Sequence, residues 1–249
     1  MSKKTAIVTG GNRGIGLDIT KAYVDAGYYV LVGARNSNDL EEKFKDQVKF
    51  VVADVRNESS HQKLVDAAVE ATGSLDVYVN NAGVSEWRPI NNIDDAFLDD
   101  LLATNLKSAF WGCKAATSAM QQGGTIINIS SIAGKRGSSN NSAYCATKFG
   151  MNGLTQALAK EVGPKGIRVN ALCPVLIPTK GLIDALKSPF SPASGDPEEF
   201  IANFKLANAA LGRLPSGPEV GSMCLFLSSE GASAITGQCI NVDCGVFPQ

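Results

Sequence analysis

The stretch Thr9-Gly10-Gly11-Asn12-Arg13-Gly14-Ile15-Gly16 determines how the rest of the chain is interpreted. It follows an apolar run at residues 6–9 and precedes an amphipathic stretch at residues 15–26. Glycines at such a junction allow a tight turn and let the backbone approach a diphosphate, while the start of the helix offers free N–H groups to the anion. A glycine run alone is weak evidence, but between a strand and a helix it predicts dinucleotide binding.

Apolar, β-branched runs alternate with amphipathic stretches along the whole chain. The predicted strands occupy residues 6–9, 28–32, 48–53, 75–79, 124–129, 167–172 and 239–242. The predicted helices occupy residues 15–26, 39–45, 59–71, 94–120, 142–162 and 218–228. Because strand and helix follow each other in regular order, the pattern predicts an α/β fold. We expect one domain over residues 1–249, built on a Rossmann-type, doubly wound parallel sheet of about seven strands with helices on both faces.

Residues 179–214 interrupt this rhythm. They are rich in Pro, Ser and Gly around residues 188–197, and a helical stretch follows at 198–211. An insertion after the carboxyl end of a strand is where an active-site lid is expected. The alternatives are a surface excursion or an oligomer contact.

Composition excludes several classes of protein. The 249 residues carry a formal net charge of −1 and no block of like charges, which argues against nucleic-acid or membrane-surface partners. The apolar run after Met1-Ser2-Lys3-Lys4 is too short for a signal peptide or a membrane span, so we expect a cytoplasmic protein. The six cysteines include no C-x-x-C pair, so we expect buried thiols and no metal site.

The end of the second predicted strand bears on the choice of dinucleotide. An acid at this position would bind the ribose hydroxyls of NAD and repel a 2′-phosphate, but Arg35 stands there instead. Arg13, inside the glycine run, is a second cation expected nearby, and two guanidinium groups suit a phosphate. We therefore expect NADP(H) rather than NAD(H). The alternative is that these arginines are solvated surface residues.

Tyr144 and Lys148 form a Y-x-x-x-K pair, thirteen residues after Ser131. His61 is the only histidine, so proton transfer is expected to use other groups. The reference pKa of a tyrosine phenol is about 10. A lysine one helical turn away would stabilise the phenolate. A serine hydroxyl could then hold a substrate oxygen near that phenol.

Together these motifs resemble the short-chain dehydrogenase/reductase family over nearly the whole chain. The matching features are Thr9-Gly10-x-x-x-Gly14-Ile15-Gly16, Asp54-Val55, Asn80-Asn81-Ala82-Gly83, Asn105, Ser131 and Tyr144-x-x-x-Lys148, in the family's order. The resemblance implies that Tyr144 is the general acid or base, that Lys148 lowers its pKa and binds the nicotinamide ribose, and that Ser131 bonds the substrate carbonyl. It further implies that Asn105 helps to anchor a water that passes protons from Lys148.

The resemblance also implies where the cofactor lies. Asp54 would contact the adenine amino group, Val55 would pack on the ring, and Thr179 would contact the nicotinamide amide. The full expected set of cofactor-binding residues is Gly10, Asn12, Arg13, Gly14, Ile15, Gly16, Arg35, Asp54, Val55, Asn81, Ala82, Gly83, Tyr144, Lys148, Pro174 and Thr179.

Two positions depart from the family's pattern. The family usually has glycine after Pro174, whereas Val175 adds a branched side chain near the nicotinamide face or the substrate mouth. Asp243-Cys244-Gly245 stands where Asp-Gly-Gly is common, in a turn that is usually part of a subunit contact.

The predicted substrate site contains Ser131, Asn141, Tyr144 and Val175. The run from Lys135 to Asn141 is polar, so we expect a small polar substrate such as a sugar, polyol or hydroxy or keto acid. The predicted activity is interconversion of a secondary alcohol and a ketone by hydride transfer. The alternative is a 3-oxoacyl-[acyl-carrier-protein] reductase, and a non-catalytic dinucleotide-binding regulator ranks below it. The resemblance implies a homotetramer, with a homodimer as the alternative.

Overall fold

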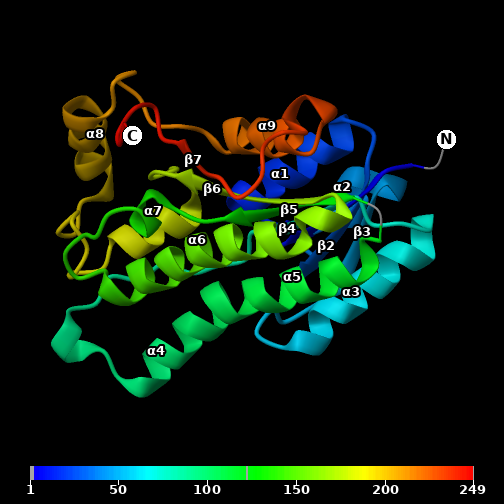
Figure 1. Cartoon of the computed structure of the whole chain (residues 1–249). Coiled ribbons are helices and arrows are strands. Elements are labelled where there is room, and N and C mark those ends of the chain that lie inside the picture. Colours follow the sequence, from blue (N-terminus) through cyan, green and yellow to red (C-terminus); the bar gives the residue numbers. More distant parts are fainter. Residues whose placement is uncertain (1–2, 122, 249) are drawn as a thin grey trace.

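The computed structural model describes residues 3–121 and 123–248, so Met1, Ser2, Gln122 and Gln249 lie outside it. Its centre is a seven-stranded parallel sheet in the order β3-β2-β1-β4-β5-β6-β7 (Figure 1). The strands are β1 Thr5–Thr9, β2 Tyr29–Ala34, β3 Val48–Val52, β4 Val77–Asn80, β5 Gly124–Ile129, β6 Ile167–Pro174 and β7 Cys239–Val242. The predicted doubly wound α/β sheet is confirmed, and each predicted strand is present within two residues at either end.

Helices cover both faces of the sheet (Figure 1). One face is covered by α1 (Gly14–Asp25) and α9 (Gly217–Leu227), which pack against each other. The other is covered by α3 (Glu58–Thr72), α5 (Ser108–Ala119) and α6 (Ser142–Val162). The remaining helices are α2 Leu40–Phe44, α4 Asp95–Leu102, α7 Lys180–Leu186 and α8 Pro197–Asn208.

The core has two halves because successive strand residues point to opposite faces of the sheet. On β1, Ala6 and Val8 pack toward α1 and α9, whereas Ile7 packs toward α3 and α5. All three side chains are fully buried. Burial on both faces explains why this strand is apolar at successive positions. Each fully buried Val, Leu or Ile contributes roughly 1.5–3 kcal/mol of transfer free energy.

The helix expected at residues 94–120 is interrupted, and this corrects the prediction. α4 ends at Leu102, a π-helical turn runs over Ala103–Lys107, and α5 begins at Ser108. The insertion segment also holds a helix that was not predicted, α7, and the helix expected at 198–211 ends at Asn208 because Ala209 is extended.

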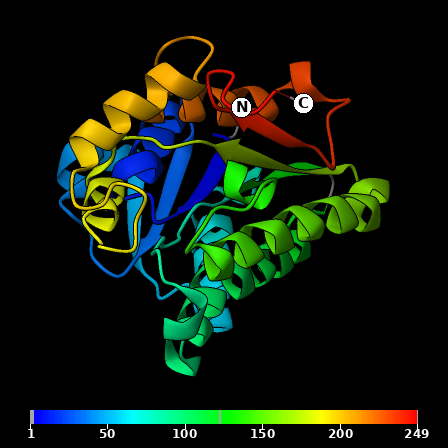
Figure 2. The same cartoon turned by 90° about the vertical axis from the view of Figure 1, so that its left-hand side faces the viewer.

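The loops that carry the predicted site lie together, because parallel strands end at one edge of the sheet. The residues following β1, β2, β4, β5 and β6 all lie at this edge. α7 and α8 lie at the same end of the molecule, which faces the viewer in Figure 2. The insertion segment is therefore placed over the ends of the strands.

Candidate active site

Two adjoining cavities occupy the carboxyl edge of the sheet. The first, of about 650 Å³, follows the glycine loop to Arg35 and Asp54. The second, of about 710 Å³, surrounds Ser131, Tyr144 and Lys148. Both are lined by Arg13, Ile15, Asn81, Gly83, Val84, Thr179 and Gly181. A long ligand could therefore extend from one cavity into the other.

The glycine loop is held against the end of β4. Thr9 Oγ1 accepts hydrogen bonds from the backbone N–H groups of Asn81 (3.0 Å) and Ala82 (3.1 Å), and Asn81 Nδ2 donates to Thr9 O at 2.8 Å. A Cβ on Gly16 would collide with Gly10 O and Asn81 Nδ2, so this position requires glycine. Arg13, at the N-cap of α1, makes no side-chain cap hydrogen bond. The first-turn N–H groups without a side-chain cap and the close-packed glycines fit a bound diphosphate.

The far end of the first cavity is rich in arginine. Arg13 and Arg35 are both exposed and both line it. The sequence prediction did not include a third, Arg56, although its place two residues after Asp54 was a signal. Arg13 and Arg35 therefore bring positive charge to this cavity, whereas the charge of Arg56 is offset by two carboxylates.

Asp54 is already engaged by Arg56. The Arg56 Nε donates to Asp54 Oδ1 at 3.0 Å and its second guanidinium nitrogen to Oδ2 at 2.6 Å, while the third donates to Asp100 Oδ1 at 2.7 Å. Hydrogen bonding from Arg56 lowers the pKa of the Asp54 carboxyl. An adenine amino group at Asp54 would therefore meet a carboxylate held in a fixed orientation.

The other predicted cofactor residues also line these cavities. Gly83 leaves room beside two polar groups, because a Cβ there would lie 3.2 Å from Asn105 Oδ1 and 3.8 Å from Lys148 Nζ. Asn12, Gly14, Ile15, Val55 and Ala82 line the first cavity, and Pro174 and Thr179 line the second. Thr179 Oγ1 also accepts a hydrogen bond from Leu182 N, which caps α7.

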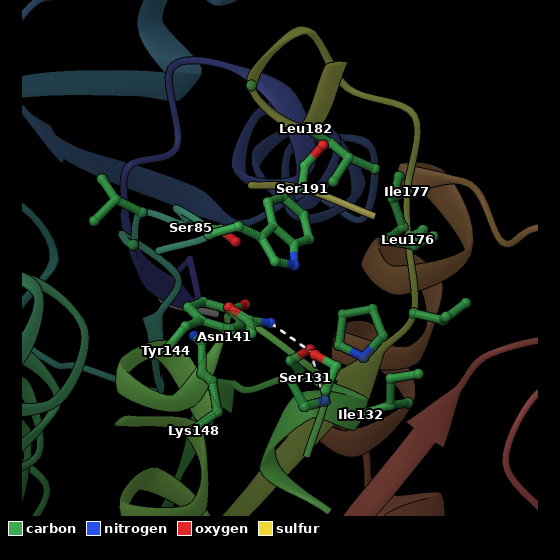
Figure 3. Close-up of a pocket in the computed structure, with 18 of the residues that line it drawn as sticks. Ser85, Ser131, Ile132, Asn141, Tyr144, Lys148, Leu176, Ile177, Leu182 and Ser191 are labelled. Atoms are coloured by element: carbon green, nitrogen blue, oxygen red, sulfur yellow. Dashed lines mark hydrogen bonds between the residues drawn. The ribbon is translucent and has the colours of Figure 1, made fainter. Parts of the chain in front are cut away.

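Ser131, Tyr144 and Lys148 come together on the floor of the second cavity (Figure 3). Ser131 follows β5, and its Oγ accepts a hydrogen bond from Ala133 N at 3.1 Å. Tyr144 and Lys148 lie one turn apart on α6, with Lys148 Nζ 5.7 Å from the centre of the tyrosine ring. The expected serine, tyrosine and lysine are thus brought to one place.

Burial shifts the pKa values of Tyr144 and Lys148. It raises the pKa of Tyr144 to about 12, and a hydrogen bond with Ser131 acts in the opposite direction. It lowers the pKa of Lys148 to about 8, and Lys148 Nζ donates to Ile129 O at 2.8 Å. The expected lowering of the tyrosine pKa by lysine is therefore not the dominant effect in this structure, because desolvation of the phenolate outweighs it.

Asn105 lies in the π-helical turn, fully buried. Its Oδ1 accepts from Val84 N and its Nδ2 donates to Val84 O, both at 2.8 Å. Nδ2 also approaches Thr147 Oγ1 at 3.3 Å. Both amide hydrogens are thus used, which leaves the main-chain carbonyl or the second Oδ1 lone pair for any water.

The walls of the second cavity are more apolar than the sequence suggested. Lys135 Nζ donates to Cys239 O, and Asn140 Nδ2 donates to Phe190 O at 3.1 Å, so neither side chain stands free in the cavity. Asn141 and Val175, both expected in the substrate site, line this cavity. The apolar lining residues include Ile132, Val175, Leu176, Ile177, Leu182, Phe200 and Phe204. Several come from the insertion segment, whose side-chain directions the sequence pattern could not indicate.

The described residues contain neither a metal-binding cluster nor a membrane-spanning helix. Within residues 3–121 and 123–248, no three His, Cys, Asp or Glu side chains are arranged to hold a metal ion. Over the same residues, no helix is both long and apolar enough to cross a bilayer.

The fold and cavities define a nicotinamide-dinucleotide-dependent oxidoreductase, and comparison with known proteins agrees. The family model described as short chain dehydrogenase matches residues 4–187. The chain belongs to the short-chain dehydrogenase/reductase family.

Relatives with named activities cover almost the whole chain. A 3-oxoacyl-[acyl-carrier-protein] reductase FabG of Chlamydia muridarum is 36% identical over 98% of this chain and 97% of its own length. An L-2,3-butanediol dehydrogenase of Corynebacterium glutamicum is 36% identical over 98% of each. A solved actinorhodin polyketide ketoreductase with NADPH superposes with a TM-score of 0.90 at 31% identity, covering 98% and 97% of the two chains.

Proposed function

We propose that this oxidoreductase interconverts a secondary alcohol and a ketone with NADP(H), using Ser131, Tyr144 and Lys148 for the proton chemistry. The observation that carries the proposal is the meeting of these three side chains in a cavity continuous with the glycine loop. A bound nicotinamide would supply or accept the hydride. The substrate carbon would then lie between the cofactor cavity and Tyr144.

Each of the other side chains has a separate role in binding the carbonyl oxygen or transferring its proton. In the reducing direction, the Ser131 hydroxyl donates a hydrogen bond to the carbonyl oxygen, opposing its growing negative charge. Tyr144 then gives its phenolic proton to that oxygen. A phenol whose pKa lies at about 12 is fully protonated at neutral pH, which suits an acid. In the oxidising direction, the positive charge of Lys148 supports the phenolate. Asn105 helps to anchor a water that returns protons through Lys148.

The preference for NADP(H) rests on charge. Arg13 and Arg35 line the first cavity, and no acidic residue stands at the end of β2. Their paired N–H donors suit a 2′-phosphate. Asp54 and Val55 would contact the adenine, and Thr179 the nicotinamide amide.

The substrate is proposed to be small and to carry oxygen functions, because Asn141 lines the cavity together with Ser131 and Tyr144. Residues 179–214 would close over it as a lid, since Leu182, Phe200 and Phe204 face the cavity. The second candidate is a 3-oxoacyl-[acyl-carrier-protein] reductase, favoured by the name of a relative and by the apolar walls. In this proposal, residues 179–214 are part of a single catalytic domain that spans residues 1–249.

The assembly is proposed to be a homotetramer of a cytoplasmic enzyme. Phe110 on α5 and Phe149 on α6 are each 48% exposed, on two helices that lie side by side. Exposed aromatic side chains on neighbouring helices suit a subunit contact. A homodimer through the same helices is the alternative.

Replacing Tyr144 by phenylalanine tests the proposal. The Tyr144→Phe protein should still bind NADPH, because it loses only one hydroxyl among the expected cofactor-binding groups. Turnover of any ketone found in an NADPH-consumption screen should fall by roughly 10²–10⁴-fold, the usual contribution of a general acid. Retained turnover would refute the role of Tyr144. NADPH binding with no turnover of any ketose, keto acid, acyl thioester or cyclic ketone would favour a non-catalytic regulator.

A further inference from the structure

A residue that lines the second cavity carries a buried amide oxygen without a hydrogen-bond partner. Of the buried side-chain oxygen and nitrogen atoms in the described residues, two have no hydrogen-bond partner, Asn141 Oδ1 and Asn241 Oδ1. Asn141 lines the cavity with Ser131 and Tyr144, whereas Asn241 lies elsewhere, bonded through Nδ2 to Phe247 O. Only 5% of the Asn141 surface is exposed. A buried acceptor without a partner costs roughly 1–3 kcal/mol.

The position of Asn141 makes this unpaired atom unusual. Asn141 is the N-cap of α6, and its backbone carbonyl accepts from Cys145 N. An asparagine at an N-cap normally turns its side-chain oxygen back onto the helix N–H groups. Here the side chain makes no cap hydrogen bond. It lies instead among the cavity residues, beside Tyr144 in Figure 3.

The amide is oriented by its other end. Nδ2 donates to Ser138 Oγ at 3.2 Å, which leaves Oδ1 as the unpaired atom. Exchanging the two ends would put Oδ1 on the Ser138 hydroxyl and leave both amide hydrogens unpaired. The structure has the orientation in which Oδ1, and not the amide nitrogen, lacks every hydrogen-bond partner, while one of the two amide hydrogens is also unpaired. A ligand group that pairs with Oδ1 must therefore be a donor.

From these contacts we infer that the substrate carries a hydroxyl group close to its reacting carbonyl, and that Asn141 Oδ1 accepts the hydrogen bond from that hydroxyl. This inference rests on the proposed ketone chemistry and names its substrate class: α-hydroxy ketones and the corresponding vicinal diols. Asn141 and Tyr144 are one helical turn apart, so the two oxygens of such a compound reach both side chains.

The surrounding walls agree with this class. The apolar side chains of Ile132, Val175, Leu176 and Leu182 line the same cavity and suit short alkyl groups on the rest of the substrate. A 3-oxoacyl thioester would place a second carbonyl near Asn141, and two acceptors would then face each other without a proton. Asn141 therefore selects the hydroxy ketone against the keto thioester.

One compound pair isolates the hydroxyl. 3-Hydroxybutan-2-one and butan-2-one differ by that group alone, and 3-oxobutanoyl-CoA serves as the thioester. We expect wild type to reduce the hydroxy ketone with at least tenfold higher kcat/KM than butan-2-one. In Asn141→Leu, this ratio should fall at least tenfold. Asn57→Leu is the matched control, because Asn57 is also an N-cap without a side-chain cap bond but is exposed, and its ratio should stay at the wild-type value.

Two further readouts separate the possible failures. Asn141→Leu should unfold at a temperature no lower than wild type, because it removes an unpaired buried group. Butane-2,3-diol should raise the melting temperature of the NADP⁺-saturated wild type and not that of Asn141→Leu. An unchanged kcat/KM ratio in Asn141→Leu, or a preference of wild type for the thioester, overturns the inference. Diol binding that is lost in Asn141→Leu, without any reduction of ketones, would keep the inference and overturn the proposed function.

Discussion

Arg35 is the residue on which the cofactor proposal can be tested most directly. Arg35→Asp removes a cation from the first cavity and supplies the acid that ribose hydroxyls would prefer. We expect the Kd for NADPH to rise at least tenfold, which corresponds to about 1.4 kcal/mol, while the Kd for NADH falls or stays constant. Quenching of protein fluorescence by each nucleotide measures both constants.

The exposed Lys63 on α3 provides the control for this change. Lys63→Asp alters net charge by the same amount away from both cavities, so its two Kd values should match those of wild type. If Arg35→Asp raised the Kd for NADPH and the Kd for NADH equally, this would contradict a role of Arg35 in binding the 2′-phosphate.

The sequence predicted which side chains meet in the second cavity better than it predicted the polar contacts around them. Ser131, Tyr144 and Lys148 could be found because their spacing along the chain is fixed by one strand end and one helix. The contact of Arg56 with Asp100 could not, since Asp100 lies on α4, far away in the sequence. The unpaired Asn141 oxygen also escapes a sequence pattern, because only coordinates show which polar atoms lack partners.

At the element scale, the π-helical turn over Ala103–Lys107 replaces part of an expected continuous helix. Residue periodicity cannot distinguish it, because the turn inserts one extra residue without a glycine or proline. Its effect is to aim Asn105 at the backbone of Val84, which lines both cavities. α7 was missed for a different reason: it is short, and the proline-rich run that follows it obscures its pattern.

Removing the Asn105 amide tests this arrangement. Asn105→Ala leaves the N–H and C=O of Val84 without their side-chain partners, so we expect a loss of roughly 1–3 kcal/mol in the free energy of unfolding. Urea denaturation followed by circular dichroism measures it. Asn203→Ala, at an exposed site on α8, should change stability by less than about 0.5 kcal/mol. Equal effects in the two variants would contradict a structural role for the Asn105–Val84 pair.

At the scale of the whole molecule, the only histidine ties two elements of the core together. His61 is buried on α3, with Nε2 2.8 Å from Val55 O and Nδ1 2.7 Å from the Tyr78 hydroxyl on β4. A carbonyl can only accept, so Nε2 carries the proton and Nδ1 accepts from Tyr78. Protonation would place a second N–H against that hydroxyl. Burial lowers the pKa of His61 accordingly.

This histidine should make stability depend on pH. Because its folded pKa lies below the unfolded value of about 6.5, its contribution is complete above that pH and is lost as pH falls toward the folded pKa. We expect the melting temperature to fall between pH 7 and pH 5, above the range where carboxylates titrate. The fall should be smaller in His61→Gln. An identical slope in the variant, or an NMR titration of the single imidazole near pH 6.5, would contradict this expectation.

The general architecture was predictable because seven apolar runs and their intervening helices leave few ways to build a sheet. The insertion segment was predictable only in position, since its side chains take their directions from packing against Ile132 and Val175. Tertiary contacts decided these details, and local pattern did not.

The order of the sheet has a consequence for the growing chain. β2 and β3 add in turn to one side of β1, and β4, β5, β6 and β7 add in turn to the other. Each new strand therefore finds its neighbour already synthesised, and none has to be inserted between strands that have paired. At ribosomal speeds of roughly 5–20 residues per second, the sheet can extend strand by strand as it emerges. The ends of β5 and β6, which line the second cavity, are completed only after β1 to β4 have been synthesised.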